Sequence, residues 1–473
     1  MKASLVWFRD DLRTADNPAL LAAAGDGAAA ALYVLDEESA GIRPLGGAAK
    51  WWLHRALEDL RDELAALGIP LILRRGAGAG VVAAVAGELG AGAVYWNRRY
   101  GGPERAVDSA VKEWAAAAGL HAESFQASLL HEPWTVRTGA GKPYQVFTPF
   151  WRALADRDFR APLGGPDAGN GFGGSPADSD RLDAWSLRPA APDWAGGLRR
   201  AWVPTAAAGH GILAEFLDGP VADYSEARDR PDRPGTSRLS PYLRWGQLSP
   251  FQVWAALAAR RGQLPGSPGP AVFGTELGWR EFCWHQLFHR PDLATANLRP
   301  QFDGFPWRWP GATAGAKPET GAKPETGAKP ETGAGHLEAW RRGRTGIPLV
   351  DAGQRELWHT GFMHNRVRMV AASFLVKNLG FHWRVGEQWF WDTLVDADAA
   401  SNPANWQWVA GSGADASPFF RIFNPETQAK KFDPEGQYVR RWVPELATPD
   451  YPEPLVDLQE SRRAALDAYA SIR

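Results

Sequence analysis

The stretch SLVWFR at residues 4–9 decides the fold, because it is the first of four short apolar runs that alternate with helical patterns. AAALYVL at 29–35, PLILRR at 70–75 and AVYWNR at 93–98 follow it, and each has the length of one buried strand. Within residues 50–67, leucines step by 4, 3, 4 and 3 positions, which is typical of an amphipathic helix. Strands and helices alternating over about 130 residues predict an α/β domain with a doubly wound parallel sheet.

The composition changes beyond this α/β region. From about 160 to 235 the chain is rich in Pro, Gly, Asp and Ala, which predicts a connector with little regular structure. Strand signals then disappear, and helical patterns cover 249–261, 275–289, 347–379 and 384–395. A chain of 473 residues has room for two or three domains. We predict an α/β domain at 1–135, a connector at 136–235 and an all-helical domain at 236–473.

One segment of the helical part is a short repeat. GAKPETGAKPETGAKPETGA at 315–334 repeats a six-residue unit three times. The period is too short for a solenoid, and every unit carries Gly and Pro and no hydrophobic face. We predict a disordered loop over about 312–335 and assign it no chemistry.

The bulk composition excludes several classes of protein. Cys283 is the only cysteine, which excludes an internal disulfide and a cysteine-rich zinc site, and no convincing His/Cys metal cluster occurs. No apolar leader follows Met1, and no segment offers about 18 uninterrupted apolar residues, so we expect a cytoplasmic protein with no membrane span. Because the formal charge is only −2, any contact with nucleic acid would come from a local basic patch.

Polar and aromatic residues gather in DADAASNPANWQW at 396–408. Asp396 and Asp398 lie two residues apart, Asn402 follows, and Trp406 and Trp408 close the stretch. The simpler interpretation is an Asp- and Asn-rich turn that leads into a helix with core tryptophans. The alternative is a site that grips a flat polar ligand.

Three further stretches carry candidate binding residues. In GTSRLSPYL at 235–243, small hydroxyl residues start a helix, where they either cap it or bind an anion such as a diphosphate. In ELGWREFC at 276–283, Glu276, Trp279 and Arg280 share one side of a helix, which is otherwise an amphipathic helix with a surface ion pair. In MHNRVRM at 363–369, a polar cluster precedes an apolar run, and Asp396 is a candidate partner for Arg368.

With these stretches in view, the sequence resembles the photolyase and cryptochrome family. The matching pieces run in order across nearly the whole chain, apart from the connector and the repeat: VWFRDDLR, GTSRLSPYL, WREF, AWRRGRTGIPLVDAG, MHNRVRM, DADAASN, WQWVAGSGADASPFFRIFNP and KFDPEGQYVRRWVPEL. Jointly these motifs are highly specific. Within the family, the chain looks most similar to bacterial class III photolyases that repair cyclobutane pyrimidine dimers.

The resemblance implies an FAD inside the helical domain. Asp396 would pair with Arg368 beside the isoalloxazine, Asp398 would bond its pyrimidine edge, and Asn402 would face the flavin N5. A neutral amide there suits an anionic reduced flavin, which a carboxylate would repel, and plant cryptochromes commonly carry Asp at this place. The remaining cofactor contacts implied by the resemblance are Tyr224, Thr236, Ser237, Arg238, Leu239, Ser240 and Arg280.

The resemblance also assigns an electron-hopping chain among the 24 tryptophans. Trp406 would be its first member, Trp383 its second and Trp307 its third. Trp309 competes with Trp307 for the last place, because the inserted repeat loosens the match between 299 and 337. Ordinary core packing is the alternative role of each indole.

Substrate contacts follow from the same resemblance. Glu276, Trp279, Asn365, Met369 and Trp408 would line a pocket for a flipped pyrimidine dimer, which is cheaper to extrude than an intact base pair. Photolyases for the (6-4) lesion carry histidines where Asn365 and Met369 stand, so cyclobutane dimers are favoured. A local basic face would bind phosphates, with Arg366 as the best single choice and Arg344 and Lys430 beside it.

The α/β domain would hold an antenna chromophore. Resemblance to class III favours methenyltetrahydrofolate, and Glu104 in GGPERAVD matches a folate-contacting Glu. Pro103 stands where some folate-binding relatives carry Asn. An 8-hydroxy-deazaflavin, another flavin or an empty site therefore stay open.

The activity implied is light-driven repair, in which excited reduced FAD lends an electron to a pyrimidine dimer in UV-damaged DNA and the cyclobutane ring opens. A blue-light receptor that uses the same flavin and tryptophans is the main rival, although a long signalling tail is not expected in the 27 residues after Leu446. A non-photochemical flavin oxidoreductase is a weaker rival, because no nicotinamide fingerprint follows the first strand. We expect the protein to act as a monomer.

Overall fold

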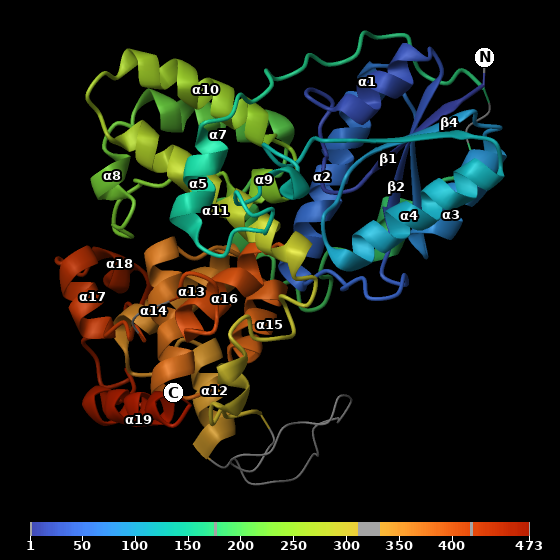
Figure 1. Ribbon diagram of the computed structural model, residues 1–473. Helices are drawn as coiled ribbons and strands as arrows, with labels where there is room; N and C mark the ends of the chain where they lie inside the picture. The colour runs from blue at the N-terminus through green and yellow to red at the C-terminus, as the bar shows by residue number, and fades with distance from the viewer. Residues whose placement is uncertain (1, 175–176, 311–331, 417–419, 473) are drawn as a thin grey trace. The chain divides into compact units, whose positions relative to one another are not determined.

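The computed structural model describes residues 2–174, 177–310, 332–416 and 420–472. The chain forms two compact units, whose elements are labelled in Figure 1. Unit 1 consists of Met1–Ala222 with Ser237–Pro291, and unit 2 consists of Asp223–Thr236 with Asp292–Arg473. The domain boundaries expected from the sequence stay a prediction, and each unit is described by itself.

A five-stranded parallel sheet forms the centre of the α/β part of unit 1. Its strands lie in the order β3-β2-β1-β4-β5, with pairs such as Val6 opposite Ala31 and Tyr95. The strands are β1 (Ser4–Phe8), β2 (Ala29–Leu35), β3 (Leu71–Arg75), β4 (Ala93–Asn97) and β5 (His121–Phe125). Four of them match the apolar runs. The fifth, HAESF, escaped the sequence analysis because it is a polar edge strand that pairs only with β4.

Helices cover both faces of this sheet, as expected for a doubly wound fold. Figure 1 draws α1 and α2 on one face and α3 and α4 on the other. The bounds are α1 (Pro18–Gly25), α2 (Gly47–Ala66), α3 (Gly78–Glu88) and α4 (Gly102–Ala117). Leu5, Val94 and Trp96 belong to the core between sheet and helices. The strand order changes direction between β1 and β4. The sheet is therefore doubly wound, as the sequence predicts.

The predicted connector contains more regular structure than its composition indicated. It carries α5 (Phe147–Ala155), η2 (Leu182–Trp185), α6 (Gly196–Ala201), α7 (Ala206–Asp218) and α8 (Tyr224–Ala227), and η1 (Pro133–Thr135) comes just before it. The expectation of little regular structure was wrong for α7, where Thr205 caps the helix by accepting from the Ala208 N–H at 3.1 Å. Two glycines inside α7 concealed it, because glycine is a poor helix former.

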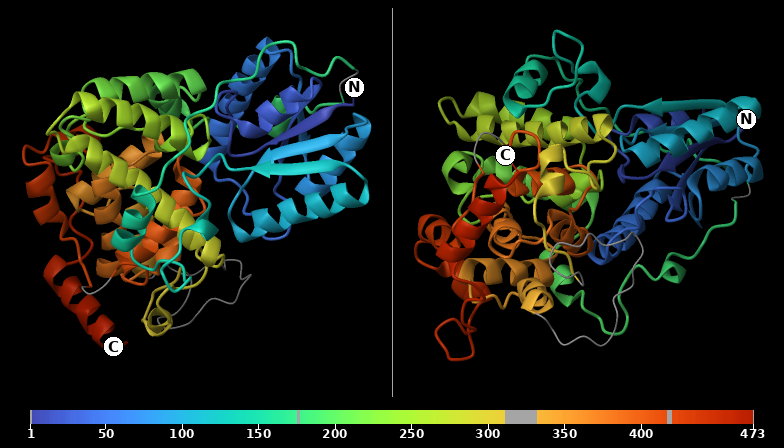
Figure 2. Two further views of the ribbon diagram at one scale, coloured as in Figure 1. Left: turned by 45° about the horizontal axis from the view of Figure 1, so that its top comes forward. Right: turned by 60° about the horizontal axis from the view of Figure 1, so that its bottom comes forward.

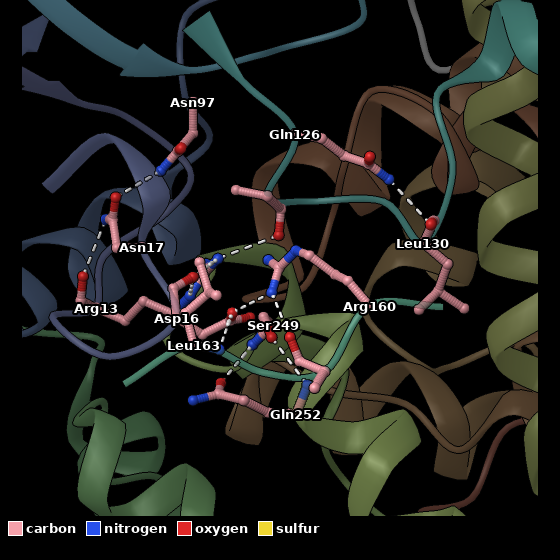
Figure 3. Close-up of polar contacts among 12 residues, drawn as sticks. Arg13, Asp16, Asn17, Asn97, Gln126, Leu130, Arg160, Leu163, Ser249 and Gln252 are labelled. Atoms are coloured by element: carbon pink, nitrogen blue, oxygen red, sulfur yellow. Dashed lines mark hydrogen bonds and ion pairs between the residues drawn. The ribbon is translucent and has the colours of Figure 1, made fainter. Parts of the chain in front are cut away.

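Three more helices complete unit 1. They are α9 (Ser240–Arg244), α10 (Pro250–Gln263) and α11 (Gly269–His289). Figure 2 gives two further views of the chain. Figure 3 shows polar contacts around Arg13, which lies between β1 and α1. Arg13 donates to the carbonyl oxygens of Asp16 at 2.8 Å, Gly246 at 2.8 Å and Ala127 at 3.1 Å. Arg13 thus links the loop before α10 to loops near the sheet, and α9, α10 and α11 lie in the sheet's compact unit, which includes Ser237–Pro291.

Unit 2 is helical, and in its described residues the only β pairing is an isolated bridge between Arg308 and Phe381. Its larger elements are α12 (Thr332–Arg341), α13 (Pro348–Thr360), α14 (Asn365–Ser373), the π-helical η4 (Phe374–Asn378), α15 (Trp383–Thr393), α16 (Ser401–Ala410), α17 (Pro425–Phe432), α18 (Gln437–Trp442) and α19 (Leu458–Ala470), and a short η3 (Pro300–Gly304) precedes them. The α/β and all-helical classes expected from the sequence are thus both present.

Two expectations for unit 2 need correction. The helical pattern over 347–379 is not one helix, because Gly361 ends α13 in the left-handed conformation, with φ 67°, and α14 starts four residues later. The predicted disordered loop at 312–335 lies largely outside the described residues. Its last residues are helical, since α12 begins at Thr332.

Candidate functional site

An ion pair with a buried carboxylate joins α14 to the turn after α15. Arg368 donates from Nη1 and Nη2 to the two carboxylate oxygens of Asp396, at 3.1 and 2.8 Å, and the Asp396 side chain is only 3% exposed. The Arg368 Nε donates to the Met363 carbonyl oxygen at 2.6 Å. This is the pair expected from the sequence. Its two-point geometry fixes the plane of the guanidinium and the direction of the turn.

Asp398 organises the start of α16. Its Oδ1 accepts from the backbone N–H groups of Ala400 at 2.8 Å and Ser401 at 2.5 Å. The simpler interpretation of the 396–408 stretch, a turn that leads into a helix, is therefore correct as far as it goes. The assignment of Asp398 to a flavin edge remains a prediction.

Asn402 is held by a residue that the sequence analysis missed. Its Nδ2 donates both hydrogens to Glu387 of α15, one to the carbonyl oxygen at 3.0 Å and one to Oε1 at 2.8 Å. Glu387 is 2% exposed and Asn402 8% exposed. Because both donors are used on Glu387, the amide oxygen is the polar atom of Asn402 that remains for a ligand. No motif marks Glu387, and only the packing of α15 on α16 reveals it.

Trp406 lies close against α15. A Cβ added at Gly386 would come within 2.0 Å of the Trp406 Cη2, so the indole touches the helix backbone. Phe390, at 4.9 Å between ring centroids, contacts the same indole edge to face. Among the described residues, no acceptor meets the buried Trp406 Nε1. A buried indole N–H without a partner is consistent with a ligand beside it.

The second and third tryptophans of the predicted chain meet at one histidine. Trp383, one turn before Gly386 on α15, donates from Nε1 to Asn297 Oδ1 at 2.9 Å. The His382 ring lies 5.3 Å from Trp383, 5.2 Å from Trp307 and 4.2 Å from Trp309, centroid to centroid. The structure therefore brings both candidates for the third position to the same ring. Trp307 is buried, and Trp309 is partly exposed.

The residues expected around a diphosphate lie at the ends of short elements. In unit 1, Ser237 and the exposed Arg238 and Ser240 flank the buried Leu239, at the start of α9. Arg238 has a φ of 53°, and its guanidinium lies 4.3 Å above the Trp202 ring. In unit 2, Tyr224 is the first, buried residue of α8, and Thr236 is partly exposed. These cofactor contacts stay predictions.

Substrate-contact candidates occur in both units. In unit 1, Glu276 and Trp279 lie on α11, and the neighbouring Arg280, which is an expected cofactor contact, donates from Nη1 to Glu281 Oε1 at 3.1 Å. In unit 2, Asn365 and Met369 lie one turn apart on α14 and are not buried. Trp408 on α16 lines a small pocket with Val409, Gly411, Ala416, Arg421 and Phe423. The Arg421 guanidinium lies 5.4 Å from the Trp408 ring centroid.

The predicted phosphate contacts differ in exposure and in whether an acidic side chain already pairs with them. Arg366 donates to Asp229 Oδ2 at 2.7 Å and lies 4.4 Å above the Phe432 ring, so its charge is already partnered. Arg344 and Lys430 are exposed on unit 2. Near Arg366, burial lowers the pKa of His364 to about 4, which leaves its Nδ1 free to accept from the Arg366 backbone N–H at 3.2 Å.

Glu104, the predicted antenna contact, is in the first turn of α4. A Cβ added at Gly101 would come within 2.1 Å of its Oε2, so the carboxylate lies over the start of the helix. A negative charge there also stabilises the helix dipole. A ligand role for Glu104 therefore stays a prediction.

The described part of the chain holds neither a candidate metal cluster nor a candidate membrane span. Among the residues that the structure describes, no group of three or more His, Cys, Asp and Glu side chains could hold a metal ion. In the same residues, no helix combines the length and the apolar character needed to cross a bilayer.

The site residues of unit 2 fit a flavin. Asn402 offers an amide oxygen, Trp406 offers an unpartnered indole N–H, and the Arg368–Asp396 pair supplies a fixed, largely buried charge pair. Such a set can bind a flat heterocycle that has both donors and acceptors on its edge.

Family models cover both ends of the chain. One described as DNA photolyase matches residues 4–167, and one described as the FAD binding domain of DNA photolyase matches residues 273–450. FAD is therefore the cofactor of the helical domain.

Similar proteins cover nearly the whole chain. A deoxyribodipyrimidine photo-lyase of Agrobacterium fabrum is 44% identical over 99% of this chain and 98% of that protein. Cryptochrome-1 of Arabidopsis thaliana is 35% identical over 94% of this chain and 63% of that protein. A crystal structure of a bacterial class III photolyase from Agrobacterium tumefaciens superimposes with a TM-score of 0.90 at 43% identity, covering 100% of this chain and 98% of that one. The chain belongs to the photolyase and cryptochrome family and resembles the bacterial class III photolyases within it.

Proposed function

We propose that this protein is a deoxyribodipyrimidine photo-lyase that splits cyclobutane pyrimidine dimers in UV-damaged DNA under light. The observation that carries the proposal is the neutral amide of Asn402, held by both its N–H groups on Glu387. Similarity to a photo-lyase over nearly the full length of both chains supports it. When bound, reduced FAD supplies the electron that opens the dimer.

The chain's own residues orient the flavin and avoid placing a net negative charge beside its anionic ring. Arg368 and Asp396 form a neutral pair, so this part of the site carries no net charge that would oppose an anionic ring. Asn402 presents an oxygen in a fixed orientation because Glu387 takes both of its donors. Trp406, Trp383 and Trp307 are buried indoles suited to carry electrons to the site, with Trp309 as the competitor of Trp307.

The proposed substrate class follows from the residue types at accessible positions of three helices, α11, α14 and α16. Asn365 and Met369 on α14 offer an amide and a thioether, neither of which donates a proton in acid catalysis. Glu276 offers an acceptor, and Trp279 and Trp408 offer flat apolar surfaces for fused pyrimidines. This set favours cyclobutane dimers over (6-4) lesions. Arg344, Lys430 and Arg366 would contact the DNA phosphates.

An antenna chromophore in the α/β domain is part of the proposal. Glu104 favours methenyltetrahydrofolate, with a deazaflavin or a second flavin as alternatives. A fluorescence excitation spectrum of the intact purified protein separates these chromophores, because a folate, a deazaflavin and a flavin absorb at different wavelengths. A cytoplasmic location and a monomeric state complete the proposal.

A blue-light receptor is the second candidate. The identity with Cryptochrome-1 over 94% of this chain favours it. The two functions share the flavin and the tryptophans and differ in whether a dimer is split.

Blue-light repair of a thymine-dimer oligonucleotide by the purified, reduced protein tests the proposal. A dark sample and a (6-4) oligonucleotide are the controls. Thymines restored only in the illuminated dimer sample support photo-lyase activity and its lesion class. Normal flavin photoreduction without repair of either lesion rejects it in favour of the receptor.

A further inference from the structure

Helix α5 places an aromatic ring directly on the face of Trp279. Phe147, the first residue of α5, stacks on Trp279 with 3.7 Å between ring centroids and 8° between planes. Parallel rings at that separation overlap almost fully, because the spacing leaves little room for a lateral offset. Phe147 is 6% exposed, while Trp279 is partly exposed. One face of the Trp279 indole is therefore covered by protein.

A third ring fixes Phe147 in this position. Trp151, one turn further along α5, lies parallel to Phe147 at 7°, with 6.5 Å between centroids. A Cβ added at Gly278 would come within 2.3 Å of the Trp151 Cε3, so this indole rests on the backbone of α11. The contact requires glycine beside Trp279. Trp279, Phe147 and Trp151 together form a ring stack that docks α5 on α11.

Phe282 closes the side of this stack. Its ring meets Phe147 at 5.9 Å and Trp279 at 6.0 Å, edge to face in both cases. With one face covered by Phe147 and one edge against Phe282, the Trp279 indole cannot rotate freely about its side-chain bonds. Among the described residues no other aromatic ring contacts Trp279, so a ligand ring would meet its second face or its remaining edge.

We propose that Phe147 is a positioning residue for damaged-DNA recognition, which sets the plane of Trp279 so that a single indole face receives the pyrimidine dimer. The inference rests on the proposed function, since it concerns recognition of the same substrate. Phe147 itself does not touch the dimer. Its replacement therefore weakens recognition of damage and leaves binding of undamaged DNA, which depends on phosphate contacts, unchanged.

Equilibrium binding in the dark measures this effect without any repair. We would titrate the intact flavoprotein against a labelled thymine-dimer duplex and its undamaged counterpart, by fluorescence anisotropy. Phe147→Leu removes the stacked ring and keeps an apolar side chain. A lost aromatic pair predicts a dimer affinity about three- to tenfold lower. Phe147→Tyr keeps the stack and should bind the dimer within about twofold of wild type.

A matched control separates positioning from a general loss of structure. Phe150 is on the same helix and is 1% exposed, and the rings around it are Tyr144, Phe282 and His285, not Trp279. Phe150→Leu should lower the melting temperature as much as Phe147→Leu does and leave dimer affinity unchanged. Equal losses of affinity in the two variants would overturn the inference.

A double-mutant cycle gives the sharpest result. If Phe147 acts through Trp279, Phe147→Leu costs no further dimer affinity once Trp279→Leu is present. Additive losses of affinity would show that Phe147 does not act through Trp279 and would reject the inference. The proposed function would survive that result, because the wild-type protein would still bind the dimer duplex more tightly than the undamaged duplex. A wild-type protein that binds both duplexes equally would reject the proposed function, and the inference with it.

Discussion

Asn402 donates both of its side-chain N–H groups to a single residue, Glu387, at 3.0 Å to the carbonyl oxygen and at 2.8 Å to Oε1. The two residues come from adjacent helices, α16 and α15, and both are buried. The contact fixes which atom of the amide remains for a ligand. It also makes the site sensitive to Asn402→Asp, a substitution that keeps the size of the side chain and adds a negative charge.

Asn402→Asp should destabilise the site. The substitution removes both donors and places a carboxylate beside the Glu387 carboxylate, where the two buried acceptors repel each other. We expect a loss of about 2–4 kcal/mol in unfolding free energy and weaker retention of FAD. Thermal melting and the flavin-to-protein absorbance ratio measure both. Asn402→Ala is the control, since it removes the donors without adding charge, and it should retain more flavin than the Asp variant.

Asp396→Asn should be costly because it leaves the Arg368 charge without a partner. The pair is bidentate, and the Asp396 side chain is 3% exposed, but Arg368 is 23% exposed and partly screened by solvent. We expect a loss of about 2–3 kcal/mol, below the range for fully buried pairs. Urea unfolding checks it. The exposed pair Arg342–Glu338 is the comparison, and Glu338→Gln should change stability by less than about 0.5 kcal/mol.

Glu281 should make stability fall as pH rises. Burial raises its pKa to about 7, despite the nearby Arg280 charge and the Leu130 N–H that donates to it at 2.9 Å. Between about pH 4.5 and 7 the folded state holds a proton that the unfolded state has lost, so the free energy of unfolding decreases across this window by about 3 kcal/mol. Unfolding titrations at pH 5 and 7.5 should show that decrease in wild type and not in Glu281→Gln.

His285, one turn after Glu281 on α11, should act in the opposite direction. Burial, with His289 beside it, lowers its pKa to about 4, and its Nε2 accepts from the Tyr144 N–H at 3.1 Å. Between about pH 4 and 6.5 the unfolded state binds the extra proton, so stability rises with pH. His285→Gln should remove that rise. If His285→Gln instead removes the decrease in unfolding free energy with rising pH, that decrease does not come from Glu281.

Gly386→Ala should destabilise unit 2 although alanine favours helices. The added Cβ would come within 2.0 Å of the Trp406 Cη2, so the indole must move. We expect a loss of about 1–3 kcal/mol and slower photoreduction of the flavin. Gly211→Ala in α7 is the matched control, because no atom lies within 4 Å of its Cβ position. That variant should gain up to about 1 kcal/mol.

Trp307→Phe and Trp309→Phe should differ in photoreduction. Both indoles contact His382, but Trp307 is fixed by a hydrogen bond from its Nε1 to the Phe302 carbonyl oxygen at 3.0 Å. We expect the Trp307 variant to photoreduce FAD far more slowly and the Trp309 variant to resemble wild type. Transient absorption of the tryptophan radicals measures the difference. The reverse order would move the third position of the chain to Trp309.

Local sequence patterns determined much of this protein. Four of the five strands, the helices around them and the helical second half follow from spacing that each segment carries alone, because periodicity reflects which face of an element is buried. Because a buried charge needs a partner, the sequence indicated Asp396 as a candidate partner of Arg368. Resemblance to the photolyase and cryptochrome family, carried by ordered motifs, located the cofactor domain.

Only the tertiary structure decided the contacts between elements. Strand β5 is too polar to be recognised alone and exists because β4 offers it a hydrogen-bonding edge. Glu387 and Phe147 occur in ordinary helical sequence, and their partners Asn402 and Trp279 come from other helices. Such pairs depend on how two helices pack, which no local pattern encodes, because packing is set by the shapes of both surfaces at once.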